Sequence, residues 1–261
     1  MKQNIISIIL AGGKGTRFNS KTINKVALPF LGKPLITYGV ELLQPVSSQL
    51  ITVVGSFEKS VKDLFKNHSP HWTYQKERLG TGHAVKIALQ TIREKSLRPQ
   101  LILIGYGDHL MFYETKTISR LINLHKKDNA SVSIITTIHH NPSKEALGRI
   151  IRNTNNQVTQ IIEHKEATEK QHQIKEINAG FYCLDYEFAK ENIDKIKKSH
   201  LTGEYYLTDI IKIAIAQKKK VSALNVPFEK VGIGINTKEE LEEAEELYKK
   251  VYQTSHKNPI T

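Results

Sequence analysis

Short apolar runs alternate with amphipathic segments along the first half of the chain. Runs rich in Ile, Val and Leu are typical of strands buried on both faces of a sheet, and they predict strands at Ile5–Leu10, Leu50–Gly55, Leu101–Gly105 and Val132–Ile138. Between these runs, apolar residues recur at helical spacing and predict helices at Leu35–Leu43, Lys59–Asn67, Thr81–Glu94 and Thr115–Lys127. This alternation predicts an α/β fold with a mostly parallel sheet and helices on both faces. Ligands of such sheets bind outside the carboxyl ends of the strands.

The second half of the chain has a more antiparallel pattern. It predicts strands at Ile150–Arg152, Val158–Glu163, Glu176–Leu184 and Val221–Asn225, and helices at Tyr186–Lys195 and Glu204–Gln217. Thr237 and Glu240 form a Thr-x-x-Glu capping box, which predicts a last helix running to about Tyr252. The polar tail from Gln253 is expected to fray. The chain contains no internal repeat or linker, so one domain is expected.

Length and cysteine usage narrow the class of protein. A chain of 261 residues can bury a core without covalent staples, and a single cysteine, Cys183, excludes an intramolecular disulfide or a cysteine metal cluster. No apolar run reaches the roughly 18 residues that span a bilayer, and the N-terminal segment has no signal-peptide cleavage pattern. We therefore expect a cytoplasmic protein without a membrane partner.

The formal charge of +12 has two interpretations. It could mark a nucleic-acid-binding protein, or it could reflect a chain that is rich in lysine throughout. The lysines are scattered and interspersed with glutamates, and no helix-turn-helix, RNA-recognition or zinc-finger pattern occurs. We therefore expect no nucleic-acid partner. A small polyanionic substrate would suit a basic protein, but net charge alone does not show one.

The segment "LAGGKGTR", Leu10 to Arg17, follows the first predicted strand. It lacks the third glycine of a G-x-G-x-x-G dinucleotide fingerprint and the spacing of a Walker A loop. Its glycines allow positive φ angles and an anion-binding nest of backbone amides. Arg17 offers a planar fork to phosphate oxygens, and Lys14 offers a point charge. A phosphate-binding loop and a tight strand-to-helix turn are the two alternatives.

This segment resembles the signature loop of the sugar-1-phosphate nucleotidyltransferases, L-[AG]-[AG]-G-x-G-[TS]-R followed by a lysine. The resemblance implies that the loop cradles a nucleoside triphosphate and that Arg17 and Lys25 are catalytic cations. The implied nucleotide-binding residues of the loop are Leu10, Ala11, Gly12, Gly13, Lys14, Gly15 and Thr16. The chain departs from the pattern twice. Asn24 stands where the family has proline, and Gly12 stands where its nearest subgroup usually has alanine.

The segment "YQKERLGTGHAV", Tyr74 to Val85, resembles the family's base-recognition segment. The amide of Gln75 can both donate to and accept from a pyrimidine edge. Gly80 and Thr81 open a predicted helix where a base can approach closely, although a glycine there can also be a simple helix cap. His83, taken alone, is expected to be a packing residue at the start of that helix.

The segment "LILIGYGDHLMF", Leu101 to Phe112, places Asp108 just past a predicted strand. Carboxylate oxygen suits Mg²⁺ that bridges phosphates, although an aspartate in a loop can also be a helix cap. The resemblance implies that Asp108 and Asn236 bind the cofactor Mg²⁺, and that Tyr106 and Gly107 lie at the nucleotide. Tyr106 alone could equally be a buried strand-end tyrosine. The histidines show no metal-binding spacing.

The block "GRIIRNTNNQVTQIIEHKEATEKQHQIKEINAGFY", Gly148 to Tyr182, resembles one subgroup closely: the uridyltransferase domain of the bacterial bifunctional N-acetylglucosamine-1-phosphate uridyltransferase/glucosamine-1-phosphate acetyltransferase. The resemblance implies that Gly148, Glu163 and Asn178 line a sugar site. "GEYYLTDII" from Gly203 matches the same subgroup and adds Glu204, although the residues just before it depart from the pattern. Individually, Glu163 and Asn178 could be solvated strand ends.

The resemblance extends from Ile5 to Glu243. It implies a Rossmann-like nucleotidyltransferase fold, a mixed, mostly parallel central sheet flanked by helices, with a small β-rich sugar-binding lobe. We expect a single domain, 1–261, with a nucleotide-binding part at about 1–138, a sugar-binding part at about 139–236 and a C-terminal helix at 237–252. The chain has no hexapeptide repeat, so acetyltransferase activity and trimerisation are not implied.

The implied reaction joins UTP to N-acetylglucosamine 1-phosphate and releases pyrophosphate. The expected partners are therefore small molecules, an NTP and a sugar 1-phosphate. Three questions stay open from the sequence: the oligomeric state, the pathway and a separate acetyltransferase partner. Two alternatives also stay open. One is the same chemistry on another nucleotide or sugar phosphate, and the other is a non-catalytic nucleotide-sugar sensor.

Overall fold

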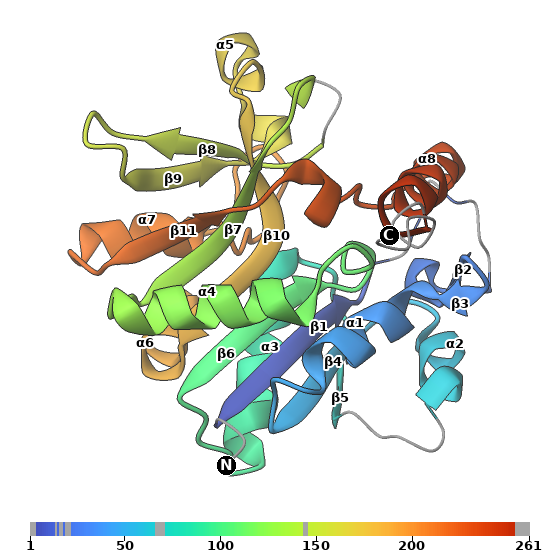
Figure 1. The fold of residues 1–261 in the computed structure, drawn as a ribbon. Coiled ribbons are helices and arrows are strands. Elements are labelled where there is room, and N and C mark those ends of the chain that lie inside the picture. Colours follow the sequence, from blue (N-terminus) through green and yellow to red (C-terminus); the bar gives the residue numbers. More distant parts are fainter. Residues whose placement is uncertain are drawn as a thin grey trace, which may run out of the picture.

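The predicted strands assemble into one twisted sheet. The computed structural model describes residues 4–13, 15, 18, 22–65, 71–142 and 146–253. Within these residues the main sheet has nine strands. Seven follow the order β11-β7-β10-β6-β1-β4-β5, and the β8–β9 hairpin branches from β10 (Figure 1). The strands are β1 Ile5–Ala11, β4 Gln49–Val54, β5 His71–Tyr74, β6 Leu101–Tyr106, β7 Val132–Ile138, β8 Arg149–Arg152, β9 Val158–Ile162, β10 Glu176–Asp185 and β11 Val221–Asn225. A separate two-stranded hairpin joins β2, Pro29–Phe30, to β3, Lys33–Pro34.

The sheet is mixed and mostly parallel, which confirms the predicted fold class. The neighbours of β1 and β4 run parallel, as do β7 and β11, whereas β10 is antiparallel to both β6 and β7. The register between β10 and β7 shifts between Asn178 and Tyr182, and Gly180 in this irregularity has φ +71°. A positive φ favours glycine, so the residue type permits the irregularity.

Helices cover both faces of the sheet. The described α-helices are α1 Leu35–Leu43, α2 Glu58–Lys62, α3 Thr81–Glu94, α4 Thr115–Lys127, α5 Glu169–His172, α6 Tyr186–Asn192, α7 Asp209–Ala216 and α8 Lys238–Tyr248. Successive side chains of a strand point to opposite faces. Ile6 and Ile8 of β1 therefore join a core with α3, α6 and α7, while Ile5 and Ile9 join a core with α1 and α4. Figure 1 shows α1 and α4 together on one side of the sheet.

Several helices differ from their predicted bounds. The helix predicted at Tyr186–Lys195 spans Tyr186–Asn192 and continues as a 3-10 turn, Ile193–Lys195. The segment predicted as a helix from Glu204 becomes helical only at Asp209. The backbone N–H of Tyr205 donates to Leu79 O at 2.7 Å, and Tyr205 O accepts from Gly82 N at 2.8 Å, so this backbone pairs with the start of α3 instead. The helix predicted at Lys59–Asn67 spans Glu58–Lys62 and continues as a 3-10 turn, Asp63–Phe65. Residues 66 and 67 lie outside the described residues.

The last helix begins where the capping box predicts. The Thr237 hydroxyl accepts from Glu240 N at 3.1 Å, and the Glu240 carboxylate accepts from Thr237 N at 3.0 Å. After α8 the chain continues as a π-helical turn, Lys249–Gln253. Tyr248 packs edge-on against Phe30 with ring centroids 5.5 Å apart, which anchors the helix to the β2–β3 hairpin. In the part of the chain that the structure describes, no helix is long and apolar enough to cross a membrane.

Candidate active site

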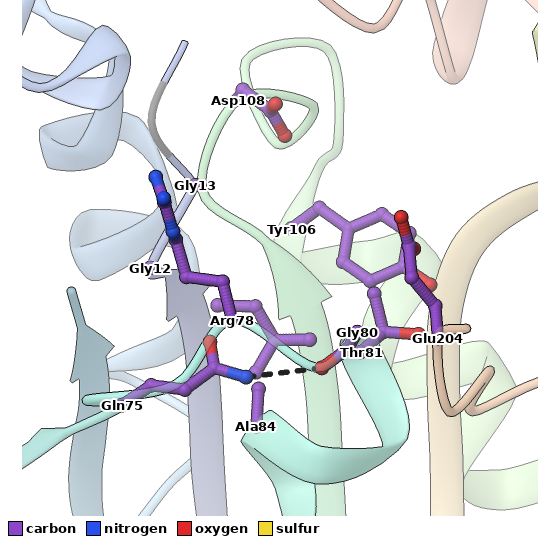
Figure 2. A pocket seen from close by; sticks show the side chains of 11 residues that line it. Gly12, Gly13, Gln75, Arg78, Gly80, Thr81, Ala84, Tyr106, Asp108 and Glu204 are labelled. Carbon is purple, nitrogen blue, oxygen red and sulfur yellow. Dashed lines mark hydrogen bonds between the residues drawn. The ribbon is translucent and has the colours of Figure 1, made fainter. Parts of the chain in front are cut away.

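A cavity of about 370 Å³ lies at the carboxyl ends of β1 and β6, beside the start of α3. This is the edge of a parallel sheet at which ligands bind. Residues from four predicted motifs meet here, and Figure 2 shows them around one space. The lining residues are Leu10, Gly12, Gly13, Gln75, Arg78, Gly80, Thr81, Ala84, Tyr106, Asp108 and Glu204.

The glycine loop leaves β1 directly into this cavity. Gly12 and Gly13 line it, and Gly15 has φ +61°, the conformation for which glycine is best suited. A Cβ at Gly15 would lie 2.9 Å from Lys25 Cβ, so the missing side chain also makes room for the lysine. Three members of the predicted loop, Lys14, Thr16 and Arg17, lie outside the described residues. Their roles stay predictions from the resemblance.

Asn24 ties this loop to its neighbour. The side chain is almost completely buried, with 1% exposure, and its amide nitrogen lies 3.0 Å from Ala11 O, 3.2 Å from Gly13 O and 2.7 Å from Ser56 O. Its Oδ1 accepts from Val26 N at 3.1 Å and caps the 3-10 turn Lys25–Ala27. Proline, the family's residue, could not make these side-chain bonds. Asn24 therefore fixes the backbone position from which the side chain of the next residue, Lys25, extends.

The two predicted metal ligands, Asp108 and Asn236, both contact the side chain of Lys25. Lys25 Nζ forms an ion pair with Asp108 and donates to Asn236 Oδ1 at 2.9 Å. Asp108 follows β6, and Asn236 directly precedes the Thr237 cap of α8. The backbone connects them as well, since Ile235 N donates to Asp108 O at 3.1 Å. A carboxylate and an amide oxygen from distant segments thus converge on one cationic position.

This donor set fits a small divalent cation. Hard oxygen ligands suit Mg²⁺, which commonly takes one or two side-chain oxygens and completes its shell with water and substrate phosphate. Asp108 and Asn236 each have an oxygen facing the Lys25 ammonium, and Lys25 is only 9% exposed. Among the described residues, no group of three or more His, Cys, Asp or Glu side chains could hold a metal by itself. A metal here would complete its coordination shell with water or with oxygens of a bound substrate.

The base-recognition segment and the "GEYYLTDII" segment lie side by side. Besides the two backbone bonds of Tyr205, the hydroxyl of Thr81 accepts from Leu207 N at 3.0 Å. Gly80 has φ +100°, and a Cβ there would lie 2.5 Å from Tyr205 O. Glycine at this position is therefore required by the packing of the two segments, and Glu204 is carried to the cavity beside Thr81.

Gln75 lies on the floor of the cavity with 5% exposure. Its Nε2 donates to Gly80 O at 3.1 Å and lies 3.2 Å from His83 Nδ1 (Figure 2 draws the first bond). A Cβ added at Gly12 would lie 2.7 Å from Gln75 Oε1. The amide oxygen of Gln75 lies in the space that an alanine methyl at position 12 would fill. The glycine that this chain has in place of the subgroup's usual alanine is therefore linked to the position of the Gln75 amide.

The predicted sugar residues form a second cluster beyond Tyr106. Asn178 Nδ2 donates to the hydroxyl of Tyr182 at 2.6 Å, and that hydroxyl lies 3.5 Å from the hydroxyl of Tyr106. Asn178 N donates to Gly148 O at 2.8 Å, which brings the first and last parts of the sugar block together. Gly148 is buried, and a Cβ there would lie 2.6 Å from Ile161 Cγ2. The residues that line the cavity do not include Gly148, Asn178 or Tyr182.

Glu163 belongs to the same side of the site. Its Oε1 accepts from the Thr208 hydroxyl at 2.8 Å. Burial raises the pKa of the Glu163 carboxyl, the Thr208 hydrogen bond opposes this, and the nearby carboxylates Glu166, Asp209 and Glu204 add to the rise. Burial likewise raises the pKa of the Tyr106 and Tyr182 hydroxyls, so both stay protonated near neutral pH and can donate.

Two of the predicted nucleotide-binding residues, Ala11 and Gly107, contribute to the packing of the protein. Ala11 is buried at the end of β1, and Gly107 N donates to Leu10 O at 3.0 Å. A Cβ at Gly107 would lie 3.2 Å from Val26 Cγ1, so this glycine allows close packing behind the cavity. His139, which follows β7, packs against the ring of Phe228 with centroids 4.5 Å apart.

Sequence reasoning missed Arg78, Ala84 and Tyr182. Arg78 is exposed at the cavity, donates to Ser56 Oγ at 3.0 Å and extends toward the glycine loop in Figure 2. An arginine two residues before a glycine turn has no local pattern that marks it as a ligand. Tyr182 stands at the end of the quoted sugar block, and its alternation with Gly180 and Asn178 along β10 could have placed it on the same face.

Comparison with known proteins shows the family to which the chain is related. A family model described as "Nucleotidyl transferase" matches residues 6–232. The protein "Bifunctional protein GlmU" of Oceanobacillus iheyensis is 37% identical over 254 residues, which covers 97% of this chain and 54% of that protein. The proteins of the same name from Clostridium kluyveri and Geobacillus sp. strain WCH70 are 35% and 37% identical, over 98% and 92% of this chain and 55% and 51% of their own lengths.

The chain thus spans about half the length of the curated relatives that it matches. The family match covers every residue that lines the cavity, from Leu10 to Glu204. The resemblance that the sequence motifs indicated is confirmed at the level of the family. This chain belongs to the nucleotidyl transferase family.

Proposed function

We propose that this chain makes a nucleotide sugar and pyrophosphate from an NTP and a sugar 1-phosphate. The substrates that the residues favour are UTP and N-acetylglucosamine 1-phosphate, with UDP-N-acetylglucosamine as product. The observation that carries the proposal is that Lys25 contacts both Asn236 and Asp108, and that Asp108 lines the cavity that also holds Gln75. A nucleotide sensor has no need for a lysine placed between two oxygen ligands.

Each part of the site has a binding role in this proposal. The base lies over Gln75 and the Gly80–Thr81 turn, and the triphosphate lies along Gly12–Gly13 toward Lys25. Arg17, assigned from the resemblance, adds a second cation for the phosphates. Glu163 and Asn178 bind the sugar hydroxyls and the acetamido group, because a carboxylate accepts from hydroxyls and an amide both donates and accepts.

The reaction is a single in-line displacement. An oxygen of the sugar phosphate forms a bond to the α-phosphorus of the NTP, the bond from that phosphorus to the bridging oxygen breaks, and pyrophosphate leaves. The attacking phosphate is already anionic at neutral pH, so the site needs no general base. Lys25 neutralises charge on the phosphates, and holding the two substrates in line can supply about 7–11 kcal/mol of the barrier reduction.

A divalent cation, with Mg²⁺ as the candidate, would be held by Asp108 and Asn236. When bound, it would supply charge neutralisation at the phosphate oxygens. The residues themselves contribute orientation: the capping box at Thr237 holds Asn236, since Glu240 also accepts from Asn236 N. The hydrogen bond from Ile235 N to Asp108 O keeps both ligand segments in register.

The direct test measures pyrophosphate release from a panel of four NTPs with several sugar 1-phosphates, each with and without Mg²⁺. The proposal expects the highest rate with UTP and N-acetylglucosamine 1-phosphate, and a rate that depends on Mg²⁺. A higher rate with another pair would keep the reaction and change the substrates. Binding of a nucleotide sugar without turnover of any pair would favour the sensor.

Asp108→Ala tests the metal ligand separately. The variant should lose Mg²⁺-dependent turnover by about 100-fold or more, because one of two protein oxygens is removed. Asp194→Ala is the matched control, since Asp194 forms an exposed ion pair with Lys86 of α3 and does not line the cavity. Circular dichroism should show both variants folded. Near-normal turnover in Asp108→Ala would contradict the metal assignment.

A further inference from the structure

The orientation of the Gln75 amide is set by a backbone carbonyl. Gly80 O can only accept a hydrogen bond, so the atom of the Gln75 amide that faces it at 3.1 Å must be the nitrogen. The amide nitrogen carries two hydrogens, and the first is used by this bond. The opposite orientation would place two oxygens against each other.

His83 takes the second hydrogen. Gln75 Nε2 lies 3.2 Å from His83 Nδ1, and since the nitrogen of the amide is a donor, Nδ1 must accept. The neutral imidazole then carries its proton on Nε2. His83 is the third residue of α3, so the helix holds the ring in place. Both N–H groups of Gln75 are thereby directed at the protein and away from the cavity.

The amide oxygen of Gln75 differs from the amide nitrogen in its hydrogen bonding. None of the described residues donates a hydrogen bond to Gln75 Oε1, and Gln75 lines the cavity. The oxygen lies in the space left by the absent side chain of Gly12, where a Cβ would come within 2.7 Å of it. Gln75 therefore presents an acceptor to a bound base and withholds its donors.

We propose that His83 is a positioning residue for base selection, acting through Gln75. The inference rests on the proposed function, in which the base of an NTP lies over Gln75. An acceptor held by His83 and Gly80 pairs with a ring N–H, as uracil has at N3. Cytosine has a lone pair at N3, so two acceptors would face each other and both would lose a hydrogen bond. Without His83, only Gly80 O would hold the amide nitrogen, so the amide could turn and present an N–H in place of Oε1, and could then pair with either base.

The test compares dissociation constants for UTP and CTP, measured by calorimetry, in the wild type and four variants. The wild type should prefer UTP by about tenfold or more, the usual effect of one unpaired buried group. His83→Leu removes the acceptor, so the preference should fall to about twofold or less. His83→Asn can place its Oδ1 near the Nδ1 position and should retain the preference.

Two further variants make the test specific. Gly12→Ala should also reduce the preference, because the new methyl displaces Oε1, while the His83 ring is untouched. Gln90→Leu, an exposed change on the same helix, should leave the preference unchanged. Thermal melts identify any variant that is unfolded, and a failed His83→Leu is replaced by His83→Phe.

Two results would overturn the inference: a folded His83→Leu protein that keeps the wild-type ratio, or a wild type that binds UTP and CTP equally. A UTP preference that disappears in His83→Leu supports the inference even if no pyrophosphate is released. Such a protein would contradict the catalytic part of the proposed function alone.

Discussion

Lys25 Nζ donates a hydrogen bond of 2.9 Å to Asn236 Oδ1, although 211 positions separate the two residues in the chain. The same ammonium forms an ion pair with Asp108. A lysine and a metal ion would therefore use the same two oxygens. The ammonium contacts both Asp108 and Asn236, and a metal ion bound to the same two oxygens would require it to give up at least one of these contacts.

This competition predicts opposite effects of Lys25→Met on metal binding and on activity. Removing the positive charge should tighten Mn²⁺ binding by about tenfold, because both competition and charge repulsion disappear. Pyrophosphate release should fall by about 100-fold, since the phosphates lose a cation. Mn²⁺ titration by electron paramagnetic resonance measures the first effect. Lys59→Met, at an exposed ion pair, is the control, and weaker Mn²⁺ binding in Lys25→Met would contradict the shared position.

Arg78→Ala should weaken NTP binding and leave the sugar phosphate unaffected. The guanidinium reaches the cavity beside the glycine loop, where a charge-assisted hydrogen bond to phosphate contributes about 1.5–3 kcal/mol. The KM for the NTP should therefore rise by about tenfold or more, with an unchanged KM for the sugar 1-phosphate. Lys76→Ala changes an exposed cation in the same loop and should have little effect. Equal effects of the two variants would mean that Arg78 contributes only to the overall charge.

Glu163→Gln should have the reverse pattern. The carboxylate that accepts from Thr208 is proposed to accept from sugar hydroxyls as well, so the KM for the sugar 1-phosphate should rise by about tenfold while that for the NTP stays the same. Burial raises the pKa of this carboxyl, so wild-type sugar binding should weaken as the pH falls through that raised pKa. The loss should begin at a higher pH than for an ordinary glutamate. Steady-state kinetics between pH 5 and 8 would measure it, and an unchanged pH profile in Glu163→Gln would exclude this carboxyl as the cause.

His125 predicts a pH dependence of stability that is independent of the site. The side chain is buried on α4 and lies 2.9 Å from Ser133 Oγ, and burial lowers its pKa to about 4. The unfolded chain would bind a proton near pH 6.5 and the folded protein only near pH 4, so stability is complete above pH 6.5 and is lost as the pH falls toward 4. The difference corresponds to about 3 kcal/mol in the free energy of unfolding.

Urea unfolding at pH 7 and pH 4.5 in the wild type and in His125→Asn would measure this loss. Asparagine can still bond to Ser133 but does not titrate, so its loss of stability between the two pH values should be smaller. His200→Asn, at an exposed position, should behave as the wild type does. A wild-type slope in His125→Asn would show that other groups cause the acid sensitivity.

The sequence predicted the elements with strong periodicity. The helices Leu35–Leu43, Thr81–Glu94 and Thr115–Lys127 and the strands Val132–Ile138 and Val221–Asn225 have the predicted bounds, because their apolar residues face continuous cores. Strand β5, His71–Tyr74, was missed, since four residues with partial burial at the sheet edge carry little hydrophobic signal. The start of α7 was wrong because the contact of Tyr205 with Leu79 and Gly82 joins segments more than 120 positions apart, which no local pattern reveals.

The candidate site likewise has some features that the sequence predicted and others that it did not. Motifs predicted that Gln75, Tyr106 and Asp108 face one cavity, and the parallel topology brings their loops together. The bond between Lys25 and Asn236 and the use of both Gln75 donors by Gly80 and His83 depend on side-chain geometry, so sequence alone did not contain them. Arg78 was missed because an exposed loop arginine has the same sequence signature whether or not it faces a ligand.

Asn24 has a consequence for redesign of this chain. Its φ of −66° lies in the range that proline adopts, so a consensus approach that imports the family's residue would meet no obstacle in this dihedral angle. Such substitutions commonly stabilise proteins. Here proline would delete the N–H that donates to Ser60 Oγ at 3.0 Å and the side chain that binds Ala11, Gly13 and Ser56. In a redesign, Asn24 should therefore be exchanged only together with the loop residues whose backbone it binds, or be left unchanged.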